Sequence, residues 1–141
     1  MKVYFDASVI IASLLSATGG SSRLLKFIKK GIIYGYTSQT VLEEILEEEK
    51  LAKFNKSANE IKEFIAQSGL VVRENITEDE IKPLEGKIDK EDAHLIAGAQ
   101  QTKCQYLVSL DKKHVLKTEV KKKFLPLIIV SPKELLQVLV K

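Results

Sequence analysis

Val3-Tyr4-Phe5-Asp6-Ala7-Ser8-Val9-Ile10-Ile11, near the start of the chain, joins two apolar segments through a single carboxylate. The β-branched and aromatic residues at 3–5 favour a strand, whereas the small and apolar residues at 8–15 favour a helix packed on a sheet. Asp6 therefore lies where a strand ends and a helix begins. A carboxylate in this position either caps the helix, which is worth about 1 kcal/mol, or anchors a cation.

The same alternation of strand and helix continues along the rest of the chain. Further strands are predicted at residues 32–37, 70–72, 106–109 and 127–130. Further helices are predicted at residues 21–30, 38–53, 57–68, 90–102 and 132–139, with a short helix through Val115 and Leu116 and one helical turn around 78–82. Strands that alternate with helices imply a mostly parallel sheet covered on both faces. We therefore expect an α/β fold, a three-layer α/β/α sandwich around a central sheet of about five strands.

Length and composition set further limits on the fold and on the function. The 141 residues, 45% of them hydrophobic, suffice for one core, so residues 1–141 are expected to form a single domain. A formal charge of +3 is too small for strong nucleic-acid binding by itself, although lysines near both ends could leave a basic rim around an acidic centre. The single cysteine, Cys104, excludes an internal disulfide and indicates a reducing compartment. No apolar run is long enough to span a bilayer, so we expect a cytoplasmic protein without membrane attachment.

Acidic residues stand at the ends of several of these predicted elements. Asp6 and Asp111 follow apolar strands, Asp92 opens a helix, and Glu44 lies early in another helix. Because parallel strands end at one edge of a sheet, we expect these carboxylates to converge there. Carboxylates gathered near a low-dielectric core repel one another unless a cation compensates them or their pKa values rise. Oxygen ligands of this kind suit Mg²⁺ or Mn²⁺, although each acid taken singly is also consistent with helix capping.

Three further segments resemble residues 3–11 in combining a run of apolar residues with an acidic residue. They are TSQTVLEEI at residues 37–45, DKEDAHLIAGA at residues 89–99 and LVSLDKKHV at residues 107–115. In this order and at these separations, the segments resemble the motifs of the PIN-domain family, metal-dependent ribonucleases that include the VapC-type toxins of toxin-antitoxin pairs. The resemblance covers nearly the whole chain. The spacing of the family motif selects Glu44, whereas helical periodicity alone does not separate it from Glu43.

The resemblance implies a divalent-metal-dependent endoribonuclease in which a water activated by Mg²⁺ or Mn²⁺ hydrolyses RNA phosphodiester bonds. The residues that it implies for metal binding and catalysis are Asp6, Glu44, Asp92 and Asp111, and the choice between one ion and two stays open. With these acids as ligands, Ser8 and Ser109 are expected to orient the carboxylates through hydrogen bonds. Lys112 and Lys113 are the candidates for RNA contact because they lie close to Asp111 in the sequence. RNA is then the substrate, an antitoxin protein is the expected partner, and we expect a homodimer.

Other functions fit the sequence less well. No glycine-rich loop follows the first strand, which argues against a dinucleotide-binding fold, and Ser8 stands where an aspartyl-phosphate enzyme has a second aspartate. His94 lies two residues after Asp92 and is expected to project away from it, so neither His94 nor His114 is interpreted as a general acid or base. The remaining alternative is a noncatalytic RNA- or protein-binding domain whose acidic residues are structural caps.

Overall fold

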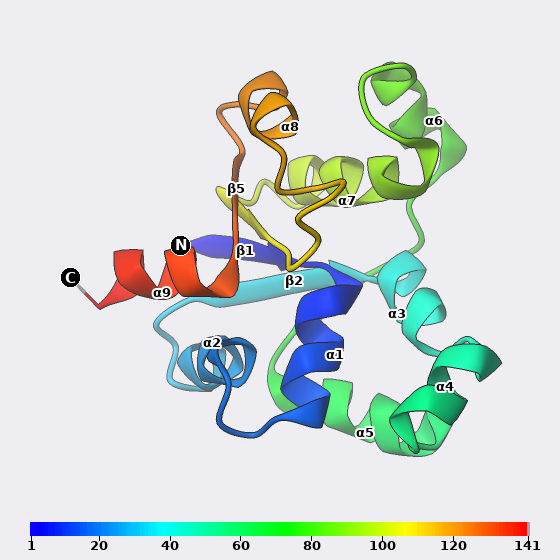
Figure 1. The fold of residues 1–141 in the computed structure, drawn as a ribbon, viewed down its shortest axis with the longest axis vertical. Coiled ribbons are helices and arrows are strands. Elements are labelled where there is room, and N and C mark those ends of the chain that lie inside the picture. The colour runs from blue at the N-terminus through cyan, green and yellow to red at the C-terminus, as the bar shows by residue number, and fades with distance from the viewer. Residues whose placement is uncertain (141) are drawn as a thin grey trace.

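Parallel strands form the central sheet of the computed structural model, which describes residues 1–140 (Figure 1). The strands are β1 (Lys2–Phe5), β2 (Tyr34–Ser38), β3 (Val71–Arg73), β4 (Tyr106–Val108) and β5 (Ile128–Val130). Their order across the sheet is β3-β2-β1-β4-β5, and every neighbouring pair is parallel. The predicted α/β/α fold with a five-stranded sheet is therefore confirmed, and the strand that precedes Asp6 is central.

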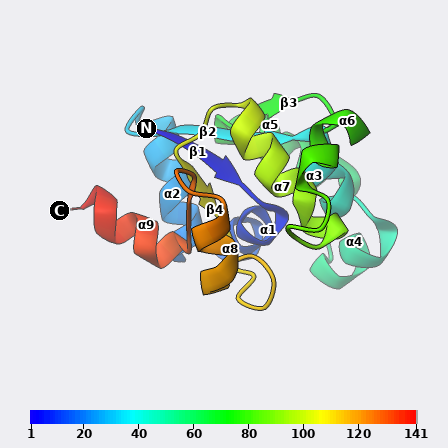
Figure 2. The same cartoon turned by 90° about the horizontal axis from the view of Figure 1, so that it is seen from above.

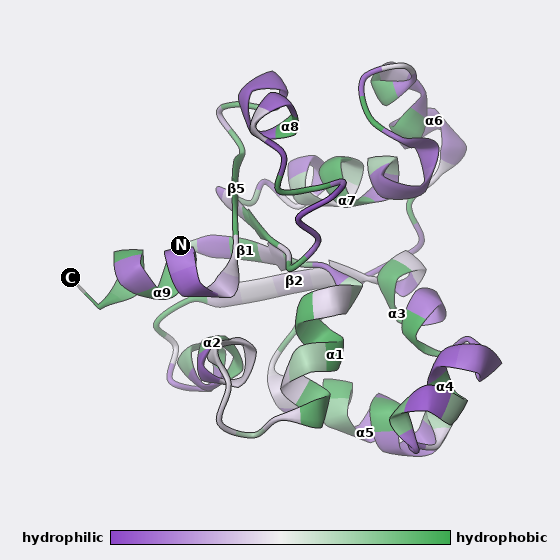
Figure 3. Ribbon diagram, in the orientation of Figure 1, coloured by the Kyte–Doolittle hydropathy of each residue, from purple (hydrophilic) through white to green (hydrophobic). Residues whose placement is uncertain are grey.

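Helices cover both faces of this sheet (Figures 1 and 2). Below the sheet in Figure 1 lie α1 (Ala7–Leu15), α2 (Gly20–Lys29) and α5 (Ala58–Ser68), and α9 (Pro132–Leu139) contacts α2 and β5. Above it lie α6 (Glu78–Ile81), α7 (Lys90–Gln101) and α8 (Thr118–Lys123), and the short 3-10 helix η1 (Lys82–Leu84) follows α6. The helices α3 (Gln39–Ile45) and α4 (Glu48–Phe54) follow the carboxyl end of β2. Figure 3 shows that α1 is mostly hydrophobic, as expected for a helix packed on the sheet, whereas α8 is mostly hydrophilic.

Tyr4 and Gly98 bring α7 unusually close to the central strand. Val3, Tyr4 and Phe5 of β1 are all completely buried. A Cβ atom at position 98 would lie 2.3 Å from the Tyr4 hydroxyl oxygen and 2.4 Å from its ring carbon Cζ, so only glycine fits there without movement. The backbone of α7 therefore packs directly on a side chain of β1, which places the first turn of α7 near the carboxyl edge of the sheet.

Most predicted elements are present within a residue or two, and two predictions are wrong. The predicted helix at 38–53 is broken between α3 and α4, where Glu47 leaves the helical conformation with a ψ of 134°. The predicted short helix through Val115 and Leu116 is absent. Instead, the backbone N–H groups of both residues donate to the carbonyl oxygen of Asp111 in a turn, and the helix begins later, at Thr118.

Within residues 1–140, no single helix has both the length and the apolar character needed to cross a membrane. The bent pair α1 and α2, whose axes differ in direction by 96°, meets these criteria only when the two helices are counted together.

Candidate functional site

Asp6 is a buried carboxylate at the junction of β1 and α1. Its Oδ1 accepts hydrogen bonds from the Ser8 backbone N–H (2.7 Å), from the Val9 N–H (3.3 Å) and from the Ser8 hydroxyl. Its Oδ2 accepts a hydrogen bond of 2.5 Å from the Ser109 hydroxyl. Burial raises the pKa of Asp6 and these hydrogen bonds oppose that shift, since they favour the charged form. The side chain caps α1 and is at the same time rigidly oriented.

The carboxyl ends of β1 and β4 are joined by the same two serines. The Ser8 hydroxyl accepts a hydrogen bond from the Leu110 N–H, and the Ser109 hydroxyl accepts one from the Asp111 N–H, both at 3.0 Å. In the strand order, the chain reverses its direction of travel across the sheet at this β1–β4 boundary. Open α/β sheets form a crevice at such a point, beyond the carboxyl ends of the strands. Asp6 and Asp111 therefore flank the position where a ligand site is expected.

Asp111 is half-buried and caps the turn that follows β4. Its Oδ1 accepts hydrogen bonds from the Lys113 N–H (3.1 Å) and the His114 N–H (3.0 Å). The His114 Nδ1 lies 3.3 Å from the other carboxylate oxygen. The side chains of Lys112 and Lys113 are exposed beside this turn.

Asp92 lies in the first turn of α7 and is close enough to Asp111 for the two charges to interact. Burial raises the pKa of Asp92, and the negative charge of Asp111 raises it further. Asp92 and Glu44 together line an open cavity of about 440 Å³, whose other lining residues are Glu47, Lys50 and Glu91. The acids of α3 and α7 therefore line one cavity, and one of them, Asp92, also interacts electrostatically with Asp111.

Glu44 and Glu43 are adjacent in sequence but have different partners. Glu44 Oε1 lies 2.5 Å from His94 Nε2, which comes from α7. Glu43 is exposed and its Oε1 accepts a hydrogen bond of 3.2 Å from Asn75 Nδ2, on the loop after β3. The structure therefore directs Glu44 toward α7 and Glu43 toward a surface loop.

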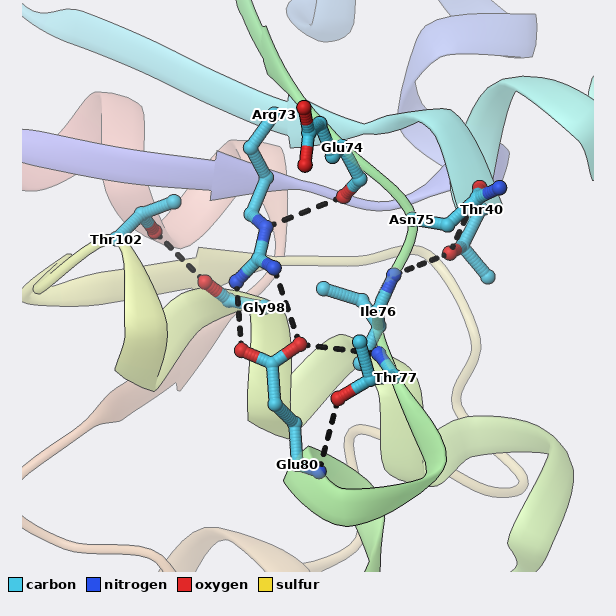
Figure 4. A network of polar contacts seen from close by, with 9 residues as sticks. All are labelled: Thr40, Arg73, Glu74, Asn75, Ile76, Thr77, Glu80, Gly98 and Thr102. Atoms are coloured by element: carbon cyan, nitrogen blue, oxygen red, sulfur yellow. Dashed lines mark hydrogen bonds and ion pairs between the residues drawn. The ribbon is translucent and has the colours of Figure 1, made fainter.

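The loop that contains Asn75 is itself fixed by polar contacts (Figure 4). The Ile76 N–H donates to Thr40 Oγ1 at 2.9 Å, and the Arg73 guanidinium makes two contacts of 3.0 Å with the carboxylate of Glu80. Hydrogen bonding from Arg73 lowers the pKa of Glu80. Because its charge is compensated within this network, Arg73 is not a free cation for the neighbouring acids.

The four acids predicted as metal ligands are only partly gathered. Asp92 lies near Asp111 and shares a cavity with Glu44, while Asp6 is bonded to the serines of the β1–β4 boundary. Within residues 1–140, no three His, Cys, Asp or Glu side chains are arranged to hold one metal ion. The ligand chemistry fits a hard divalent cation, because the donors are carboxylate oxygens. Burial disfavours the charge of Asp6 and of Asp92, and repulsion from Asp111 adds to this at Asp92. Closing three of these donors on one ion requires side-chain movement.

His94 is the polar contact that sequence reasoning missed. Spacing within α7 predicts only that His94 projects away from Asp92. It does not predict which element lies on that side, and in the structure that element is α3. The His94 side chain is 8% exposed and reaches Glu44 of α3. No pattern within 89–99 reveals this contact, because the adjacency of α3 and α7 arises only when the sheet is assembled.

Comparisons with known proteins agree with this fold. A family model described as "PIN domain" matches residues 2–113. Among solved structures, the chain is similar to one from a crystal structure of VapBC2 from Rickettsia felis bound to a DNA fragment from its promoter. That match has a TM-score of 0.63 at 14% sequence identity and covers 93% of this chain and 98% of the other. A search of curated proteins gives no match.

Proposed function

Because the chain belongs to the PIN-domain family, we propose that it is a divalent-metal-dependent endoribonuclease whose active site lies at the carboxyl edge of β1 and β4. The observation that supports this most directly is the state of Asp6. It is a 4% exposed carboxylate held by two serines at the crevice of the sheet, with two further acids, Asp92 and Asp111, close to one another nearby. Family membership and this placement together support a nuclease rather than a generic α/β domain.

In this proposal Asp6, Glu44, Asp92 and Asp111 hold Mg²⁺ or Mn²⁺. The ion supplies Lewis-acid chemistry when bound: it polarises the scissile phosphate and lowers the pKa of a water molecule. Ser8 and Ser109 keep both oxygens of Asp6 oriented, one from each side. No side-chain nucleophile is needed, and neither histidine is assigned proton transfer.

The substrate proposed for this site is RNA. Lys112 and Lys113 follow Asp111 directly and are exposed, so their ammonium groups can reach phosphates on either side of the scissile bond. The chain has a formal charge of only +3, so binding is expected to be weak and salt-dependent. These two lysines then position the RNA backbone and do not specify its sequence.

A toxin role is the biological setting that we propose. The similar structure is one of a VapBC2 complex with promoter DNA, so the chain's own counterpart would be an antitoxin protein encoded with it. A homodimer is part of the same proposal. Size-exclusion chromatography with light scattering tests the oligomeric state, and co-expression with the product of the adjacent gene tests the partner.

The competing function is a noncatalytic binding domain, which a specific observation favours. Asp6 and Asp111 both accept backbone N–H groups at the beginning of a helix or turn, as structural caps do. In that case the acids contribute to stability alone, and their replacement changes the melting temperature without abolishing any divalent-dependent reaction.

Cleavage of an unstructured, end-labelled RNA by the purified chain distinguishes the two functions. Reactions contain Mg²⁺, Mn²⁺ or EDTA, and the proteins are the wild type, Asp6→Asn, Asp92→Asn and the control Asp79→Asn, an exposed acid on α6. The nuclease proposal expects divalent-dependent cleavage that Asp6→Asn and Asp92→Asn abolish and Asp79→Asn retains. Wild-type protein that is folded and inactive with both ions contradicts it.

A further inference from the structure

We propose that His94 is a positioning residue that holds the Glu44 carboxylate against α7, in the orientation that metal binding requires. This inference rests on the nuclease function proposed above and extends it to a residue outside the set of acids. Its basis is the contact of 2.5 Å between His94 Nε2 and Glu44 Oε1, which joins two helices from different parts of the chain.

The two partners differ in their freedom to move. The His94 side chain is 8% exposed and lies within the run from Ala93 to Ala99, all of which is buried. The Glu44 side chain is 34% exposed and extends from α3 beside the open cavity that it shares with Asp92. A packed imidazole is therefore the fixed member of the pair, and it restricts a carboxylate that otherwise has several rotamers available.

Glu44 needs such a partner more than the strand-edge acids do. Two serine hydroxyls and two backbone N–H groups bind Asp6, and two backbone N–H groups bind Asp111. No other hydrogen bond or ion pair reaches the Glu44 carboxylate within residues 1–140. Without His94, no polar contact in that part of the chain would keep the Glu44 carboxylate near Asp92, and it could turn toward solvent.

The other ring nitrogen of His94 indicates that packing alone does not explain the residue. Nδ1 is buried and has no hydrogen-bond partner within residues 1–140. A buried polar atom without a partner costs stability, and an aliphatic side chain of similar volume would avoid that cost. Within residues 1–140, Nε2 is therefore the ring nitrogen with a close polar partner, the Glu44 carboxylate at 2.5 Å, and a contact this close to a carboxylate oxygen requires a proton on Nε2.

Two amide substitutions separate the polar contact with Glu44 from the shape of the ring. In His94→Gln the amide nitrogen can occupy the place of Nε2 and still donate to Glu44, whereas in His94→Asn it lies near the place of Nδ1 and falls short. The measurement is the dissociation constant for Mn²⁺ by isothermal titration calorimetry on the full chain, with a thermal melt of each variant to establish folding. We expect His94→Gln to stay within about threefold of the wild type and His94→Asn to bind about 10–100-fold more weakly, the usual effect of losing a residue that orients a ligand.

The outcomes distinguish this inference from the function on which it rests. If the wild type binds no Mn²⁺, the metal-dependent function is wrong and the inference falls with it. If the wild type binds Mn²⁺ and His94→Asn binds equally well, only the role of His94 is overturned. Equal weakening in both variants overturns the donor role of Nε2.

A measurement on the unmutated ring covers the case in which the variants do not fold. A long-range ¹H–¹⁵N correlation spectrum of the wild type reports which nitrogen of His94 is protonated. We expect the proton on Nε2 and a shift of its resonance in Glu44→Gln, with no shift in Glu43→Gln. A ring protonated on Nδ1 and not on Nε2, or an unchanged resonance in Glu44→Gln, overturns the inference.

Discussion

Asp6 and Glu44 are held in opposite ways. Asp6 is 4% exposed and is bound by groups in the first turn of α1 and by the Ser109 hydroxyl directly after β4, so its position is set where β1, α1 and β4 meet. Glu44 is on a helix outside the sheet, is half-buried, and depends on one side chain of α7. The comparison teaches that one half of the site, around Asp6, is held rigidly by contacts at the β1–α1 junction and the end of β4. The other half, around Glu44, depends on how α3 and α7 dock.

The largest effect that tests this comparison is expected for Asp6→Asn. The substitution keeps the shape and the capping oxygen but removes the charge that would bind a cation. We expect cleavage to fall about 1,000-fold, since a lost metal ligand costs several kcal/mol and each tenfold corresponds to about 1.4 kcal/mol. Single-turnover cleavage measures it, and calorimetry confirms folding. Activity above about one tenth of the wild type would mean that the rigid half of the site is only structural.

Ser109→Ala tests how much the contacts around Asp6 contribute to the free energy of unfolding. It removes the donor to Asp6 Oδ2 and the acceptor for the Asp111 N–H. We expect a loss of about 1.5–3 kcal/mol in the free energy of unfolding, the range for hydrogen bonds to charged groups. Ser13→Ala is the matched control, because Ser13 is also buried but donates only to the carbonyl oxygen of Ile10. Urea denaturation of both variants should show the smaller loss in the control, and equal losses would contradict the role of the charge.

Glu44→Gln and Glu43→Gln test the half that depends on docking. The two residues are adjacent, and only Glu44 contacts α7 and the cavity of Asp92. We expect Glu44→Gln to reduce Mn²⁺ affinity and cleavage about 10–100-fold and Glu43→Gln to change both by less than about twofold. The assays are calorimetric titration and RNA cleavage. The reverse order would assign the metal to Glu43 and the loop of Asn75.

The smallest expected effect is in the pH dependence of stability. Burial raises the pKa of Asp6 above its usual 3.8, so between 3.8 and its folded value the native state binds more protons than the unfolded state. Stability is therefore lost as the pH rises through that window, by at most about 1.4 kcal/mol per pH unit for one group. Asp6→Asn lacks this contribution, so its stability relative to the wild type should increase with pH above 3.8 in metal-free buffer. Urea titrations at several pH values measure the difference, and a constant difference would mean that Asp6 is not perturbed.

The two halves also differ in how well the sequence predicts them. Asp6 follows a three-residue apolar run, and local rules suffice to place it at a strand end and at the cap of α1. Ser38 and Ser57 cap α3 and α5 in the same way, by accepting the backbone N–H groups of Val41 and Glu60. These are interactions between residues close in sequence, which explains why patterns detect them.

The contacts around Glu44 could not be predicted from the sequence, because they join residues that are far apart in the chain. Periodicity does not separate Glu43 from Glu44, and their different orientations come from Asn75 and His94, far along the chain. The turn after Asp111 was missed for a different reason, because its contacts are local. Asp111 accepts backbone N–H groups with both its carbonyl and its side chain, and this competes with the helix that Val115 and Leu116 favour by composition.

The contact between Gly98 and Tyr4 bears on how inactive alleles of this gene should be interpreted. Any larger residue at 98 would meet the Tyr4 ring, which is completely buried, so either the ring or α7 must shift, and a shift of α7 would carry Asp92 and His94 with it. A genetic selection for loss of function should therefore recover Gly98 alleles among the carboxylate alleles, although Gly98 touches no substrate. Second-site suppression distinguishes the two groups: a smaller apolar residue in place of Tyr4 can restore a Gly98→Ala allele, whereas no core substitution can restore a lost carboxylate.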